Sequence, residues 1–258
     1  MIFRQIHYGP SGCASYFLGC PKAKEAVVVD PVAGVGMDEY LMEAADRGVT
    51  IRHVIDTHVH ADHVSLGREL AEATGAAYYL GEHARGLVRF DFTPLADGQV
   101  LQVGAVQVKA LYTPGHTPEH VCLLVTDTAR SDEPWFVLTG DTLFVGDVAR
   151  PDLLVGDRSL DVWDARERAE HLYESLTQRL LALPDHVEVY PGHFGGSACG
   201  GVNMSGKAAS TLAYERRFNL ALQQPDAERF AEFVVSTLKP LPHNYQNIKR
   251  RNLGLEAG

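Results

Sequence analysis

The sequence lacks the features that mark secreted, membrane-spanning and nucleic-acid-binding proteins. Its four cysteines, Cys13, Cys20, Cys122 and Cys199, are scattered and include no CxxC pair, so we expect neither a disulfide scaffold nor a zinc knuckle. The segment 1–6 has no apolar signal-peptide core, and no run approaches the roughly 20 apolar residues that span a bilayer. The net charge of −10 argues against a nucleic-acid partner. We therefore expect a cytoplasmic protein in a reducing compartment, without a membrane partner.

The composition is that of an ordinary globular protein. The chain has 258 residues, of which 45% are hydrophobic and 22% charged, so it can bury a large core. It contains no long polar linker, low-complexity run or clear internal repeat. The simplest prediction is one domain over residues 1–258, which ends in helices and a basic tail at 249–251.

Apolar periodicity predicts an alternating order of strands and helices. We expect strands at 2–8, 13–18, 26–30, 51–55, 76–80, 99–103, 106–111, 121–126, 136–138 and 187–190. We expect helices at 37–47, 64–74, 161–182, 207–222 and 226–237, with Asp161 as the N-cap of the longest. The β-α-β-α-β order of the first 80 residues is typical of a layered α/β protein.

One stretch carries an unusual density of metal-ligand types. The segment 57–63, THVHADH, follows a predicted strand and places His58, His60, Asp62 and His63 within six residues. Neutral imidazole and carboxylate are natural ligands of divalent metals. The stretch therefore predicts half of a metal site.

Three later strands each end in a further ligand type. His116, Asp141 and His193 follow apolar runs, and a turn that contains glycine precedes each of them. Strand ends on one edge of a sheet converge in space, which is where α/β proteins place their ligands. We therefore expect these side chains to complete the metal site.

The four motifs together resemble the metallo-β-lactamase-fold superfamily. They are THVHADH (57–63), TPGHT (113–117), TGDTLF (139–144) and YPGH (190–193). The resemblance implies an αββα four-layer sandwich, with two mixed sheets face to face, helices outside and a metal site at one edge. Members include β-lactamases, glyoxalase II thioesterases, lactonases, RNA-processing nucleases and persulfide dioxygenases, so fold alone does not give the reaction.

The resemblance allows two metal arrangements. In the hydrolases of the family, of the glyoxalase II or lactonase type, two Zn(II) ions would polarise a carbonyl for attack by a bridging hydroxide. One zinc would take His58, His60 and His116. The second would take Asp62, His63 and His193, and Asp141 would bridge the two.

In the persulfide dioxygenase branch, one Fe(II) would be held by His58, His116 and Asp141 only. Two histidines and a carboxylate form the facial triad of non-haem iron oxygenases. The remaining four residues would hold water and orient the ligands, and Asp62 and His63 would be the candidate catalytic residues.

Residues outside the metal motifs favour the iron branch. The segment 140–153 resembles the persulfide dioxygenase motif, although Ala149 replaces its usual glycine. Arg150 and Asp152 are candidates to bind the thiol carrier, since arginine holds a carboxylate bidentately. The alternative is an Arg–Asp ion pair that only fixes the loop.

Further segments bear on the same choice. Residues 63–67 depart from the His-Gly-Gly of glyoxalase II, and segment 205–219 resembles bacterial persulfide dioxygenase-like proteins. Tyr190 and Tyr245 are candidates to line the substrate pocket, with core packing as the alternative. Cys199 could carry a persulfide, although an unreactive structural thiol is the favoured interpretation.

We therefore expect a persulfide dioxygenase. It would oxidise glutathione persulfide, or a similar thiol persulfide, with O2 to sulfite and free thiol. The dinuclear zinc hydrolase remains the alternative, and a non-enzymatic metal sensor is disfavoured by the complete ligand set. The family implies a homodimer.

Overall fold

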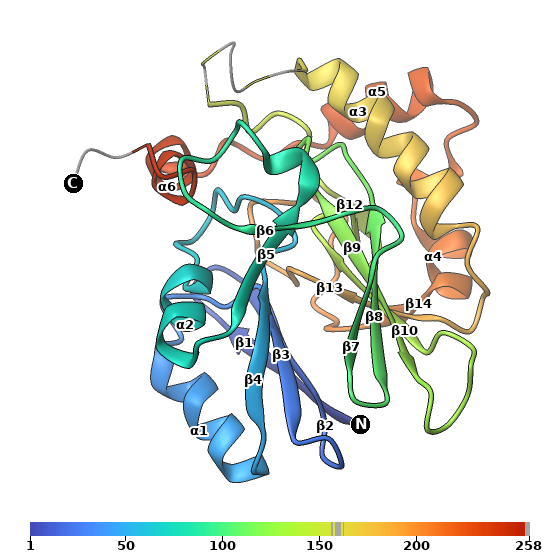
Figure 1. The fold of residues 1–258 in the computed structure, drawn as a ribbon. Coiled ribbons are helices and arrows are strands. Elements are labelled where there is room, and N and C mark those ends of the chain that lie inside the picture. The colour runs from blue at the N-terminus through green and yellow to red at the C-terminus, as the bar shows by residue number, and fades with distance from the viewer. Residues whose placement is uncertain (156, 158–160, 162, 256–258) are drawn as a thin grey trace.

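Two six-stranded sheets form the centre of the molecule (Figure 1). The computed structural model describes residues 1–155, 157, 161 and 163–255. The first sheet has the order β1 (Ile2–Tyr8), β2 (Cys13–Cys20), β3 (Glu25–Val29), β4 (Thr50–Ile55), β5 (Ala77–Gly81) and β6 (Thr93–Leu95). The second has the order β14 (Ser210–Thr211), β13 (Glu188–Pro191), β10 (Phe136–Gly140), β9 (Val121–Asp127), β8 (Val106–Tyr112) and β7 (Val100–Val103). A small hairpin pairs β11 (Leu143–Phe144) with β12 (Asp147–Val148).

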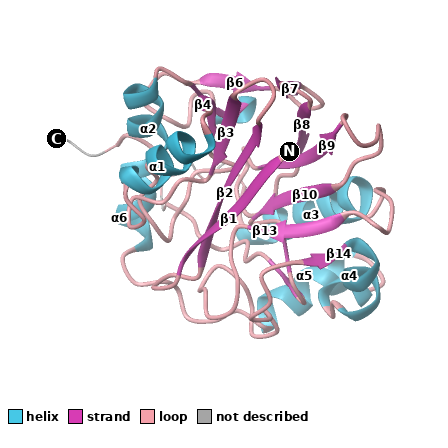
Figure 2. Ribbon diagram, turned by 90° about the horizontal axis from the view of Figure 1, so that it is seen from below, coloured by secondary structure: helices cyan, strands magenta, loops and turns pink. Residues whose placement is uncertain are grey.

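Helices cover the outer faces of both sheets. Figures 1 and 2 show α1 (Met37–Arg47) and α2 (Gly67–Thr74) against the first sheet. Against the second lie α3 (Ala165–Glu174), which a π-helical turn (Ser175–Leu180) extends, α4 (Leu212–Phe218) and α5 (Ala227–Ser236). Short 3-10 turns occupy Glu82–Ala84 and Ala221–Gln223, and α6 (Tyr245–Asn252) follows α5. The predicted four-layer αββα sandwich is confirmed.

The central strands are apolar on both faces because each face is covered. All eight residues of β2 are buried. Tyr16 and Leu18 point into the core between the sheets, whereas Phe17 points into the core beneath α1 and α2. Successive side chains of a strand face opposite ways, so such a strand has a continuous apolar run rather than an alternating one.

Strand direction brings the predicted ligands to one edge. In the first sheet β3, β4 and β5 are mutually parallel. In the second, β10 is parallel to β13 and antiparallel to β9, which is antiparallel to β8. Hence β8, β10 and β13 run in the same direction, and the loops that leave their carboxyl ends meet at the same side of the sheet.

The longest predicted helix begins later than expected. Its N-cap is Asp164 rather than Asp161, and Asp164 forms a capping box with Glu167. Asp161 instead accepts a hydrogen bond from the Val155 amide at 2.8 Å. The prediction of Asp161 as N-cap was therefore wrong, and Val162, which was expected on the apolar face, lies outside the described residues.

Two other helices and the tail also differ from the prediction. Helix α2 begins at Gly67 rather than residue 64, because residues 57–66 form an irregular loop. The segment 207–222 holds β14, α4 and part of a 3-10 turn instead of one helix. The expected basic tail is wrong as well, since 245–252 form α6 and Lys249 is buried. Among the described residues, no helix is long and apolar enough to cross a bilayer.

Candidate metal centre

Three predicted ligands converge from three different strands. His58 follows β4, His116 follows β8 and Asp141 follows β10. Asp141 Oδ2 lies 3.8 Å from His58 Nε2 and 3.6 Å from His116 Nε2, and all three side chains are buried. Ligands about 2.0–2.2 Å from one ion lie ~3 to 3.6 Å apart, so small adjustments would let these atoms share a metal.

The second ring nitrogen, Nδ1, of each of the two histidines is held by a neighbouring group. The Thr57 hydroxyl donates to Asp30 and lies 3.0 Å from His58 Nδ1, so it is available to accept from that nitrogen. His116 Nδ1 donates to the Arg150 carbonyl at 2.8 Å. Such contacts hold the Nε2 lone pairs toward the shared point, which is the usual arrangement for metal-bound histidine.

The chemistry of these atoms fits a divalent cation. His58 Nε2 and Asp141 Oδ2 are buried and have no hydrogen-bond partner among the described residues. Unpaired buried polar atoms are destabilising, and a metal would satisfy both. Burial, together with neighbouring histidines, holds the pKa of His58 well below its usual value, so its imidazole is neutral. Burial opposes ionisation of Asp141, but His193 outweighs it and lowers the Asp141 pKa to about 2.

A second group of ligand types lies beside the first. It contains Cys13, Asp62, His63 and His193. Asp62 Oδ2 lies 2.8 Å from His193 Nε2, 3.1 Å from His63 Nδ1 and 2.9 Å from Cys13 Sγ. These distances are hydrogen-bond lengths, and three donors therefore converge on one carboxylate oxygen.

His193 links the two groups. Its Nδ1 lies 2.7 Å from Asp141 Oδ1, while its Nε2 lies 2.8 Å from Asp62 Oδ2. Burial lowers its pKa, but the two carboxylates outweigh burial and raise the pKa well above the usual value. The same competition between burial and Asp62 raises the pKa of His63. Both imidazoles are therefore suited to donate hydrogen bonds to these carboxylates.

The His60 ring lies beside that of His58, with centroids 4.2 Å apart, but its Nε2 belongs to a third cluster. Its Nε2 lies 3.1 Å from Asp30 Oδ1, and Asp30, Asp56 and His60 form a separate buried group of potential ligands. The structure thus divides the predicted ligands into a three-residue set and two neighbouring hydrogen-bonded clusters.

The two predicted carrier-binding residues are paired with each other. Arg150 Nε and Nη2 donate to the two carboxylate oxygens of Asp152 at 2.6 and 2.9 Å. Arg150 Nη1 donates to the carbonyls of Ala198 and Pro240. The Arg150 side chain is buried, whereas that of Asp152 is 25% exposed, so Asp152 is the member of the pair that can meet a solute.

The two predicted tyrosines lie in different surroundings. Tyr190 packs on Phe3 and Phe136, and its hydroxyl donates to Glu188 at 2.9 Å. Its side chain thus belongs to the margin of the core between the sheets. Tyr245 is the half-buried first residue of α6.

Cys199 lies close to the metal-ligand set. Its sulfur is within 4.8 Å of ligand atoms of Asp141 and His193. Burial raises the pKa of the Cys199 thiol well above its usual value, so the neutral thiol is favoured over the reactive thiolate.

The sequence reasoning missed three residues that support the centre. Cys13, at the start of β2, has no local signal, because its contact with Asp62 spans 49 residues. Glu119 accepts a hydrogen bond from the Val59 amide at 2.7 Å. His120 accepts one from the Asp141 amide at 3.0 Å, and burial lowers its pKa to about 3. A second histidine four residues after His116 was visible in the sequence and could have indicated this role.

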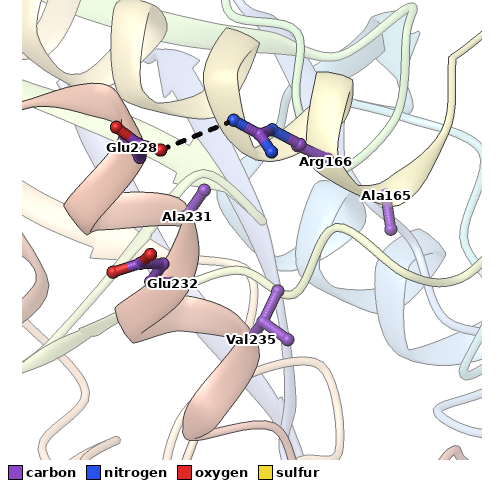
Figure 3. Close-up of a pocket in the computed structure, with 6 residues that line it drawn as sticks. All are labelled: Ala165, Arg166, Glu228, Ala231, Glu232 and Val235. Atoms are coloured by element: carbon purple, nitrogen blue, oxygen red, sulfur yellow. Dashed lines mark ion pairs between the residues drawn. The ribbon is translucent and has the colours of Figure 1, made fainter.

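A surface hollow elsewhere is separate from this chemistry. Figure 3 shows the pocket between α3 and α5, where Arg166 and Glu228 form an ion pair at 4.0 Å across its rim. Alanine and valine side chains form its apolar part. None of the residues that line it is a predicted metal ligand. The metal centre therefore remains the candidate active site.

The fold and the converging ligands define a metal-binding protein with an αββα sandwich. The family model of the metallo-beta-lactamase superfamily matches residues 8–193, a span that contains all four motifs. The chain belongs to this superfamily of metal-dependent enzymes.

Individual relatives cover the chain to different extents. A hydroxyacylglutathione hydrolase of Polaromonas sp. is 32% identical over 183 residues, which cover 69% of this chain and 61% of the relative. A metallo-beta-lactamase from Staphylococcus aureus has a TM-score of 0.88 at 31% identity, covering 99% of this chain and 73% of that one. ETHE1 from Myxococcus xanthus has a TM-score of 0.80 at 30% identity, and the match covers 99% of this chain and 100% of that one. The chain spans 55–62% of the length of three of its curated relatives.

Proposed function

We propose that this protein is a persulfide dioxygenase that uses one Fe(II) held by His58, His116 and Asp141. The substrate would be glutathione persulfide or a similar thiol persulfide, R–S–SH. The reaction would be R–S–SH + O2 + H2O → R–SH + sulfite + 2 H⁺. Both atoms of O2 enter the terminal sulfur, and the sulfur–sulfur bond breaks with the thiol as leaving group.

The division of the ligand types into separate groups is the observation that supports this proposal. Two imidazoles and one carboxylate share a point, as in a facial triad, which leaves coordination positions open for small molecules. His60 bonds to Asp30, and both nitrogens of His193 bond to carboxylates. A dinuclear zinc site would need one of the two His193 nitrogens as a metal ligand, whereas His60 Nδ1 is unpaired among the described residues and is compatible with either arrangement.

The protein side chains have distinct tasks in this scheme. Fe(II), when bound, supplies the redox chemistry and the positions at which sulfur and O2 meet. His193 holds Asp141 Oδ1, so that Oδ2 remains directed at the metal position. We assign to Asp62 and His63, which are hydrogen bonded to each other, the holding of the water that completes sulfite. The nearly complete burial of the ligand set limits the entry of other water.

We assign carrier recognition to the loop that follows the hairpin β11–β12. Arg150 fixes Asp152 by two parallel hydrogen bonds, and the partly exposed Asp152 carboxylate suits the ammonium group of a glutathione-like carrier. Tyr245, half-buried at the start of α6, is the aromatic candidate to contact the carrier.

A second candidate function is a dinuclear zinc thioesterase or lactonase. One observation favours it: His63 Nε2 and Asp62 Oδ1 are buried without hydrogen-bond partners among the described residues, and both belong to the second group. The hydroxyacylglutathione hydrolase likeness points the same way, but it covers only part of each chain.

The test is metal analysis of protein purified without oxygen, combined with O2 uptake on glutathione persulfide. The proposal expects about one iron per chain and O2 uptake with sulfite release. Two zinc ions per chain, thioester hydrolysis and no O2 uptake would instead select the hydrolase.

A further inference from the structure

Helix α6 makes specific contacts with the loop that carries His58. In Figure 1 this helix, drawn in red, lies on the same side of the sheets as α2. The Asn252 amide Nδ2 donates to the His60 and His63 carbonyls, both at 2.8 Å. The Ser65 amide donates to Asn252 Oδ1 at 3.1 Å. One side chain from the end of α6 thus bonds the backbone of this loop at three positions.

These bonds add to a short backbone contact at the end of the loop, where Ser65 forms an isolated β-bridge with Val32. Residues 57–65 contain no helix and no named strand, so their backbone groups need other partners. The two carbonyls that accept from Asn252 flank Asp62 on either side in the sequence. Fixing both carbonyls restricts the peptide planes that aim the side chains of this loop.

An apolar contact acts in the same place. Leu253, directly after α6, is 3% exposed and belongs to one buried cluster with Val59 and Val155. Val59 lies between His58 and His60 in the sequence. The loop is therefore held from α6 by packing as well as by hydrogen bonds.

The same helix also holds the loop behind His116. Buried Lys249 donates from Nζ to the Leu153 carbonyl at 2.7 Å. Three residues earlier, the Arg150 carbonyl accepts the hydrogen bond from His116 Nδ1. Lys249 and Asn252 lie one helical turn apart, so one face of α6 supports the surroundings of two metal ligands.

We infer that α6 stabilises the conformation of the metal centre and that Asn252 is a positioning residue for the His58 loop. The inference rests on the metal site of the proposed function but not on the reaction carried out there. Residues that support metal ligands typically change metal affinity by about 10–100-fold when they are replaced.

The test compares two Asn252 variants with a matched control on the same helix. Asn252→Ala removes all three bonds, whereas Asn252→Asp keeps the size and the acceptor but loses both donations to carbonyls. The control is Asn247→Ala, because Asn247 is exposed and its amide donates only to Asn244 among the contacts of the described chain. Full-length protein is loaded with Co(II), and its affinity is measured by competition with a chelator, alongside the visible d–d spectrum.

We expect both Asn252 variants to lose about 10–100-fold in Co(II) affinity and to show shifted d–d bands, while Asn247→Ala matches wild type. Affinity and spectrum within twofold of wild type in Asn252→Ala would overturn the inference. An equal loss in Asn247→Ala would also overturn it, since it would indicate general destabilisation of α6. Iron or zinc as the native metal, and oxidation or hydrolysis as the reaction, leave these outcomes unchanged.

A measurement on the unsubstituted protein tests the inference even if the variants do not fold. If α6 holds the loop, the Ser65 amide exchanges with solvent only when α6 opens. Its hydrogen-exchange protection in the metal-free protein should therefore equal that of the central amides of α6. Exchange at Ser65 more than tenfold faster than in α6 would contradict the inferred role of α6.

Discussion

His193 bridges Asp141 and Asp62, with Nδ1 2.7 Å from Asp141 Oδ1 and Nε2 2.8 Å from Asp62 Oδ2. One imidazole thus joins the three-residue metal set to the neighbouring cluster. Because both of its nitrogens are engaged, we propose that His193 supports the metal ligand Asp141 and is not itself a ligand.

Replacing His193 should leave the number of bound metals unchanged. In His193→Ala, Asp141 loses a hydrogen bond but His58, His116 and Asp141 all remain, so we expect one iron per chain with about 10–100-fold weaker binding. Metal analysis at saturating iron measures the number of bound ions per chain. A fall from two metals to one would instead identify His193 as a ligand of a second ion.

Replacing a member of the converging set should remove the metal. We expect Asp141→Ala to contain less than a tenth of the wild-type iron and to show no O2 uptake, because the only carboxylate of the triad is lost. His53→Ala is the control, since His53 lies on β4 but is hydrogen bonded to Tyr79 away from the site. Wild-type iron content in Asp141→Ala would refute the ligand assignment.

The Cys13 thiol should not bind metal in the wild-type protein. Its sulfur contacts Asp62, His63 and His193, which together would form a second site if they were free to ligate. We therefore expect the Co(II) protein to lack a thiolate-to-cobalt charge-transfer band in the near ultraviolet. A band present in wild type and absent in Cys13→Ser would demonstrate a thiolate-containing second site and favour the dinuclear alternative.

Breaking the Arg150–Asp152 pair should destabilise the fold. Asp152→Ala leaves the buried Arg150 guanidinium without its carboxylate, and we expect the free energy of unfolding to fall by about 3 kcal/mol. Urea denaturation of the metal-free protein measures it. Asp185→Ala breaks the exposed pair with Arg216 and should change the free energy by less than about 1 kcal/mol. Equal effects of the two substitutions would contradict the buried-pair argument.

Lys249 should make the fold more stable at alkaline pH. Burial, followed by the nearby Arg168 charge, lowers its pKa from 10.5 to about 8. Between about pH 8 and 10.5 the unfolded chain then binds more protons than the folded chain, so stability rises with pH in this window. The total rise is on the order of 3 kcal/mol.

The Lys249→Met variant isolates this contribution. The rise should be missing from its unfolding free energies across the window, whereas Lys207→Met, which changes an exposed lysine, should keep the wild-type profile. Parallel pH profiles for wild type and Lys249→Met would show that the folded protein does not lower the pKa of Lys249.

The side chains that gather at the site could be predicted because their signals are local. His116, Asp141 and His193 each follow an apolar strand and a glycine turn, and strand direction then brings them together. The roles of Cys13 and Asn252 could not be predicted in this way. Their partners lie 49 and about 190 residues away, and no spacing in the sequence encodes such contacts.

The errors in the helices have a similar origin. Asp161 and Asp164 are both plausible N-caps by residue type, and the Glu167 that completes a capping box with Asp164 was the local signal that distinguished them. The basic segment 249–251 was expected to be a solvated tail, but burial of Lys249 against the Leu153 carbonyl depends on tertiary packing.

The bond between Asn252 and the His63 carbonyl also bears on when the site can form. The two residues are 189 positions apart in the chain. At the usual rate of protein synthesis, roughly 10 to 40 seconds pass between the emergence of the histidine loop from the ribosome and that of the residue that secures it. His116 and Asp141 emerge within that interval, before Asn252, so the ligand set is complete before it is fixed, and we expect stable metal uptake only after α6 has been synthesised.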